Sequence, residues 1–100
     1  MSDKMPPIHA GEILRELFLD PAGISPYRLA KETGLSPTRI SQILKGKRGI
    51  SAETALRFSR YFGNSPEYWL GIQAQYDLAK AQDDLRERID AEVRPLAAVG

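Results

Sequence analysis

The sequence predicts an all-α fold, with five short helices and a helical extension at the C-terminal end. Two observations support this prediction. Apolar residues recur at the helical spacing in successive segments of the chain. The pair Ser-Pro occurs at residues 25–26, 36–37 and 65–66. A serine side chain accepts a hydrogen bond from a free N–H at a helix start, and the fixed φ of proline suits the first helical position.

Length and composition limit the class of protein. A chain of 100 residues, 42% of them hydrophobic, fits one globular domain with a single core. No apolar run approaches the ~20 residues that cross a bilayer, and we expect no signal peptide. The chain has no cysteine, so disulfides and thiolate metal sites are excluded. We expect a cytoplasmic protein with a flexible arm (1–7), a domain (8–80) and a charged helical extension with a loose tail (81–100).

The first helix is expected to begin between Ile8 and Gly11 and to run to Leu19. Its apolar stripe comprises Ile13, Leu14, Leu17 and Phe18. The turn-forming residues 20–23, DPAG, predict its end. His9 is the only histidine and lacks the partners that a metal site needs. A hydrogen bond at the helix start is its favoured role.

Residues 25–45 predict two short helices joined by a tight turn. Gly34 falls where a left-handed residue would end the first helix, and Ser36 opens the second. One apolar seam can join them if they cross steeply around Ala30 and Gly34; it comprises Leu29, Ala30, Leu35, Ile40, Ile43 and Leu44. This is the helix-turn-helix arrangement, whose second helix commonly enters the major groove of DNA.

Positive charge is concentrated in this region. Residues 1–32 carry four basic and five acidic residues, and residues 53–100 carry six and eight. Residues 33–52 have no acid and sum to +4, from Arg39, Lys45, Lys47 and Arg48. A basic band confined to one helix and the loop after it indicates contact with phosphates; a solvated basic surface is the alternative.

The loop 45–49 closes the second helix with two glycines and can bring cations and N–H groups to a phosphate. A glycine-rich nucleotide cradle is the alternative, but no strand precedes the loop and its spacing is not that of a P-loop. Ser51 is expected to cap the next helix, with Ile50 as a hydrophobic staple. In that helix four residues recur at the helical spacing, Ala55, Leu56, Ser59 and Phe62, and the helix is expected to end at residues 63–64.

The helix opened by Ser65 carries apolar and aromatic residues on more than one face, which is the composition of a dimer interface core. The candidates are Tyr68, Trp69, Leu70, Ile72 and Tyr76. Covering the underside of the core is the alternative for Trp69 and Leu70, and we expect both roles. Beyond Asp77 a thin apolar seam continues in a charged helix, which either binds a partner or is solvated; Pro95 ends any helix.

Several motifs resemble one family. Ala30, Gly34, Leu35, Ile40 and Ile43 match, in register, the helix-turn-helix of the Cro/C1-type (Xre) regulators. Residues 9–14, HAGEIL, resemble the HPGE-[IV]-L opening of the HigA/VapI-type antitoxins, with alanine in place of the usual proline. Residues 45–51, 65–70 and 73–78 resemble that subfamily's GKRGIS, SPE-aromatic-WL and QAQYDL segments.

This resemblance implies a lambda-repressor-like domain and a homodimeric repressor without a cofactor. Such proteins bind a palindromic operator upstream of their own toxin–antitoxin pair and neutralise a RelE-like ribonuclease toxin. Two alternatives remain: a stand-alone Xre-type regulator, and a protein-interaction module that keeps the helix-turn-helix only as a scaffold. An enzyme is not expected, because Asp83 and Asp84 have no nucleophile or base beside them.

Within residues 36–45, the outward positions predict the DNA contacts. The expected base contacts are Thr38, Arg39, Ser41 and Gln42. Gln42 is the best base reader, because its amide can bond adenine N6 and N7 together. The expected phosphate contacts are Ser25, Tyr27, Arg28, Ser36, Lys45, Lys47 and Arg48. Whether Arg39 contacts a base or a phosphate stays open, and a capping role is favoured for Ser36.

Overall fold

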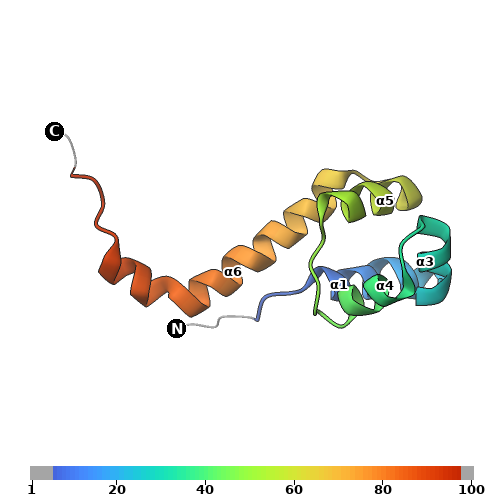
Figure 1. Ribbon diagram of the computed structural model, residues 1–100, viewed down its shortest axis with the longest axis horizontal. Helices are drawn as coiled ribbons and strands as arrows, with labels where there is room; N and C mark the ends of the chain where they lie inside the picture. Colours follow the sequence, from blue (N-terminus) through green and yellow to red (C-terminus); the bar gives the residue numbers. More distant parts are fainter. Residues whose placement is uncertain (1–5, 98–100) are drawn as a thin grey trace.

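The computed structural model describes residues 6–97. This part of the chain contains five continuous helical segments and no strand. The first segment contains α1 (Ala10–Ile13), the π-helix η1 (Leu14–Leu19) and α2 (Asp20–Ala22). The others are α3 (Pro26–Thr33), α4 (Pro37–Leu44), α5 (Ala52–Phe62) and α6 (Pro66–Glu92). In Figure 1 the first four segments form a bundle, and α6 leaves it as a long projecting helix.

Serine caps open four of these helices. The hydroxyls of Ser25, Ser36, Ser51 and Ser65 each accept a hydrogen bond from the backbone N–H three residues later. Each cap satisfies one N–H that has no partner inside the helix. Gly34 follows α3 with a φ of 76°, a left-handed conformation that favours glycine. The caps and the stop predicted from the sequence are therefore confirmed.

The first helical segment differs from its prediction. It continues through Ala22 and ends only at Gly23, so residues 20–22 belong to the helix instead of a turn. The π-segment bonds residues five apart, which puts Leu14 and Leu19 on the buried face. Leu17, expected in the apolar stripe, is 61% exposed. The predicted role of His9 is confirmed, because its Nδ1 accepts the Gly11 N–H at 2.9 Å.

Trp69 lies at the centre of the core. Its ring is fully buried and stands 5.1 Å from the Phe58 ring and 5.0 Å from the Phe18 ring. Its indole N–H donates to Asn64 at 2.9 Å. The core of the described residues joins all five helical segments. Leu56, one of the residues that recur at the helical spacing in α5, is 59% exposed and lies outside this core.

The backbone of α1 packs closely against one face of α4. A Cβ added to Gly11 would lie 2.0 Å from the carbonyl oxygen of Ile43, a separation that no side chain tolerates. Glycine at this position therefore lets α1 lie directly against α4. Ile40 and Ile43 are fully buried at the same contact. The opposite face of α4 is consequently turned towards solvent.

α6 crosses the expected domain boundary at residue 80 without interruption and ends at Glu92. Its first turns pack on α5 and α1, whereas its second half extends away from the bundle and bends (Figure 1). The arm expected at 1–7 lies mostly outside the described residues, as does the end of the tail.

Candidate nucleic-acid interface

The solvent face of α4 is polar and slightly hollowed. A hollow of about 470 Å³ is lined by Pro37, Thr38, Ser41, Gln42, Lys45 and Lys47. Three predicted base contacts and two predicted phosphate contacts thus lie together. The hollow presents hydroxyl, amide and ammonium groups, which are the groups that contact base edges and phosphates.

The turn after α4 folds the chain back along this face. The Lys47 N–H donates to the Gln42 carbonyl at 2.8 Å, and the Gly46 N–H donates to the Ile43 carbonyl at 3.0 Å. Gly46 adopts a left-handed φ of 75° between these bonds, a conformation that glycine reaches without steric cost. The turn returns Lys47 to the hollow and brings Arg48 to Gln42.

Arg48 contacts the predicted base reader. Its Nε donates to Gln42 Oε1 at 2.8 Å. The sequence assigned Arg48 to a phosphate and Gln42 to a base, and it did not predict that they would meet. They are six residues apart, a separation that an uninterrupted helix would not bring to one place. The only signal in the sequence was Gly46, which permits the reversal.

The basic residues of this region fall into two groups. Arg39 pairs with Glu53 at 3.4 Å, and Arg48 is bonded to Gln42. Lys45 and Lys47 are exposed and make no ion pair with any residue in the described range 6–97. The lysines are therefore free to meet a phosphate, whereas the arginines are held in defined directions.

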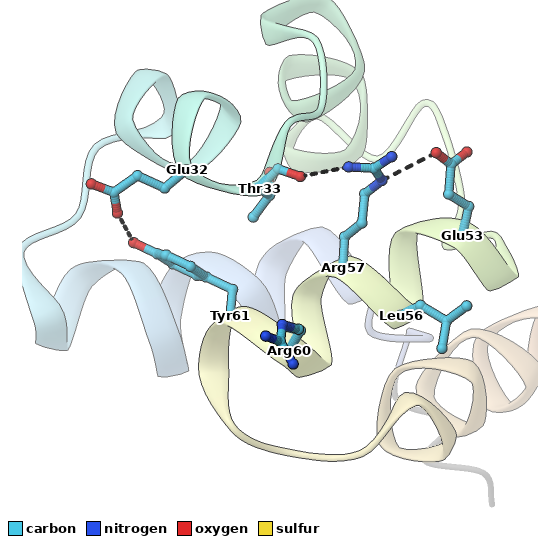
Figure 2. A pocket seen from close by; sticks show the side chains of 7 residues that line it. All are labelled: Glu32, Thr33, Glu53, Leu56, Arg57, Arg60 and Tyr61. Carbon is cyan, nitrogen blue, oxygen red and sulfur yellow. Dashed lines mark hydrogen bonds and ion pairs between the residues drawn. The ribbon is translucent and has the colours of Figure 1, made fainter.

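The start of α3 supplies the other predicted phosphate contacts. Ser25 caps the helix, and Tyr27 is 70% exposed. Arg28 is engaged by Glu32 at 3.1 Å, and Glu32 also accepts a hydrogen bond from Tyr61 of α5 (Figure 2). These donors, Tyr61 first and Arg28 next, lower the pKa of the Glu32 carboxyl. Arg28 uses its Nε–H on this carboxylate, so a phosphate contact would fall to its terminal N–H groups.

A second cleft, of about 410 Å³, lies between α3 and α5 (Figure 2). Arg57 spans it, donating to the Thr33 carbonyl at 2.9 Å and to Glu53 at 3.1 Å. Arg57 first, and Arg39 after it, hold the pKa of the Glu53 carboxyl below its usual range. Arg57 thus satisfies a free carbonyl at the end of α3, a role that the sequence did not reveal. The cleft shares no residue with the hollow on α4.

Comparison with known proteins places this geometry in a family. The helix-turn-helix family model matches residues 14–69. Virulence-associated protein I of Dichelobacter nodosus is 51% identical over 82 residues, covering 82% of this chain and 76% of that protein. Antitoxin HigA-1 of Vibrio cholerae is 35% identical over 96 residues, covering 93% and 87%. The chain belongs to the helix-turn-helix family that includes the HigA antitoxins.

A solved HigA structure has the same fold. The Pseudomonas aeruginosa antitoxin HigA, solved with the higBA promoter, is 42% identical and superposes with a TM-score of 0.88. The alignment covers 90% of this chain and 98% of that one. The Cro/C1-type fold and the HigA/VapI-type resemblance predicted from the motifs are confirmed.

The residues predicted for a dimer interface of this HigA-like chain lie in different environments. Trp69 is a core residue, so its assignment to an interface is corrected: its ring has no surface left for a partner. Ile72 packs on the core, and Tyr76 meets the His9 ring edge-on at 4.8 Å. Tyr68 and Leu70 are 39% and 38% exposed, and they keep surface that a second copy could cover.

Within residues 6–97, no group of three or more His, Asp or Glu side chains is placed to hold a metal ion. No helix in the same range is both long and apolar enough to cross a membrane.

Proposed function

We propose that this protein is a sequence-specific DNA-binding repressor that acts as a homodimer and as the antitoxin of a HigBA-type pair. The observation that carries the proposal is the polar hollow on α4, which presents Thr38, Ser41 and Gln42 beside two lysines that form no ion pair within residues 6–97. The HigA relative solved with its promoter supports it, because the fold and the motifs around α4 are shared.

In the proposed complex, α4 enters the major groove. Thr38, Ser41 and Gln42 face base edges, and Arg39 at the rim is steered by Glu53. Lys45 and Lys47 contact phosphates on one side of the groove, and the start of α3 contacts phosphates on the other side. Phosphate contacts fix the position of the protein, whereas base contacts select the sequence.

Two copies are proposed to read a palindrome, with half-sites about 34 Å apart, one helical turn of DNA. The exposed parts of Tyr68 and Leu70 are the proposed dimer contacts that the structure leaves accessible. The operator is proposed to lie upstream of the protein's own operon, so that the dimer represses its own synthesis. The protein is proposed to act in the cytoplasm. Its activity is proposed to consist of binding, without a catalytic step.

The antitoxin role is proposed from family membership. The partner would be a small RelE-like ribonuclease encoded beside this gene. Co-expression with the neighbouring reading frame tests it: the two products are expected to co-purify, and growth arrest by the neighbour alone is expected to be relieved. Repression of the operon without relief of growth arrest would instead indicate a stand-alone regulator.

DNA binding is tested by mobility shift on the upstream DNA across a range of salt concentrations. We expect log Kd to depend linearly on log salt, because phosphate contacts release counterions. Lys47→Ala should weaken all sequences similarly and lower the slope by about 1. If the protein does not bind this DNA, or if its binding does not depend on salt, the result would support the alternative in which the helix-turn-helix is only a scaffold. Protection of a single half-site would argue against the dimer.

A further inference from the structure

The bond between Arg48 and Gln42 fixes the orientation of the glutamine amide. An arginine side chain has only N–H donors, so the Gln42 atom 2.8 Å from Arg48 Nε is the amide oxygen. The amide nitrogen therefore points away from Arg48. Within the described part of the chain, no protein group accepts a hydrogen bond from that nitrogen. Its two N–H groups are left for a ligand.

The turn after α4 holds this arrangement in place. The Lys47 N–H bonds to the carbonyl of Gln42 itself, so the residue before Arg48 is tied to the residue that Arg48 contacts. The remaining guanidinium N–H groups of Arg48 also have no protein acceptor in residues 6–97. The two side chains together form a set of adjacent donors at the rim of the hollow.

We propose that Arg48 is a positioning residue for base recognition, and that the Gln42–Arg48 pair selects guanine at one position of each half-site. This inference rests on the proposed function. Guanine offers two acceptors in the major groove, O6 and N7. Adenine offers N7 beside the N6 donor, so it needs the glutamine oxygen as well as the nitrogen. Arg48 takes one of the two lone pairs of that oxygen and holds the oxygen towards itself, so the pair is less suited to the adenine predicted from Gln42 alone.

The experiment selects binding sites from a random duplex library, then measures the affinity of the selected duplex by fluorescence anisotropy. Gln42→Ala identifies the base position that Gln42 reads. Arg48→Lys is the decisive variant, because lysine keeps the charge but places a methylene where arginine has Nε. Lys47→Ala is the matched control for a phosphate contact in the same turn.

We expect the wild-type protein to prefer guanine over adenine at the position of Gln42 by roughly 5- to 150-fold. Arg48→Lys should remove this preference or shift it to adenine, while the salt slope stays unchanged. Lys47→Ala should lower the salt slope by about 1 and leave the preference intact. In the Gln42→Ala background, Arg48→Lys should change the preference no further, because the two residues act as one unit.

Two results would overturn the inference. One is a wild-type preference for adenine at that position. The other is an Arg48→Lys protein that keeps the guanine preference, since Arg48 would then act without orienting the amide. Failure of the proposed function has a different signature: the wild-type protein would select no sequence from the library and show no salt-dependent binding.

Discussion

The two halves of α6 are one continuous helix in two opposite environments. Residues 66–76 pack on the domain, where Trp69 is fully buried and Gln73 bonds the loop before α5. Residues 77–92 project from the bundle (Figure 1), and their apolar side chains are exposed or only half-buried, with Leu78 at 60% and Ile89 at 46%. The same secondary structure therefore rests on packing in one half and on local interactions in the other.

A helix and a packed domain therefore need not end at the same residue. Most helical stability in proteins comes from packing of an apolar face, and long helices without it depend on propensity and on pairs four residues apart. In the second half such a pair joins Lys80 and Asp84 at 3.9 Å. An exposed pair of this kind stabilises a helix by well under 1 kcal/mol. We therefore expect substitutions to cost much more in the first half than in the second.

The largest effect is expected at Trp69. Trp69→Ala removes the central ring of the core and should lower the free energy of unfolding by about 3–5 kcal/mol. Urea unfolding followed by circular dichroism measures this at one fixed protein concentration, because a dimer makes stability depend on concentration. Leu78→Ala is the matched control on the second half and should stay within about 0.5 kcal/mol of wild type. Equal losses in both variants would contradict the division of α6.

A smaller effect is expected at Gln73. Its Oε1 accepts the N–H of Ile50 at 2.7 Å, and its Nε2 donates to Asp77 at 2.9 Å. Gln73→Ala leaves the partly buried Ile50 N–H without a partner and should cost about 1–3 kcal/mol. Gln75→Ala, an exposed change on the same half of the helix, is the control. A Gln73→Ala protein as stable as the control would show that water replaces the bond.

His9, whose ring meets Tyr76 of α6 edge-on, is expected to make the stability of the domain depend on pH. Burial lowers the pKa of His9 from its usual 6.5, although Asp77 and Glu12 act in the opposite direction. Protonation also removes the Nδ1 lone pair that accepts the Gly11 N–H. Because the folded state favours the neutral ring, its contribution to stability is present above about pH 6.5 and is lost as the pH falls through the lower folded pKa.

The measurement compares wild type with His9→Asn, which can still cap the helix but does not titrate. The free energy of unfolding of the wild type should fall relative to the variant as the pH is lowered from 7.5 to 5. The difference should be smaller than the loss at Gln73. Parallel pH profiles for the two proteins would show that His9 does not titrate differently in the folded and unfolded states.

How far the sequence predicted the fold follows from the range of each interaction. Serine caps and the stop at Gly34 depend on residues within one turn, so they could be predicted from local chemistry. The helix-turn-helix seam could be predicted because its apolar residues recur at fixed spacing around Ala30 and Gly34, which are small enough for two helices to approach closely. The π-segment could not, since its shifted hydrogen bonds place Leu17 outside through tertiary packing of Leu14 and Leu19.

The candidate site shows the same limit. The residues on the outer face of α4 follow from helical periodicity, and the structure places Thr38, Ser41 and Gln42 together as expected. The partners of the arginines do not follow from it. Arg39 meets Glu53 of another helix, and Arg48 meets Gln42 only because the turn reverses the chain. Periodicity therefore predicts which side chains face outward, but not which are already engaged.

The smallest effect is expected at Ile89, in the projecting half of α6. Its side chain is 46% exposed and lies with Leu78 along a shallow groove. Ile89→Ala gives up little burial and gains helix propensity, so the free energy of unfolding should stay within about 0.5 kcal/mol of wild type. Urea unfolding at two protein concentrations, tenfold apart, tests this. A loss that grows at the higher concentration would contradict a solvated helix and show that a second copy covers the seam, whereas a loss equal at both would show packing within one chain.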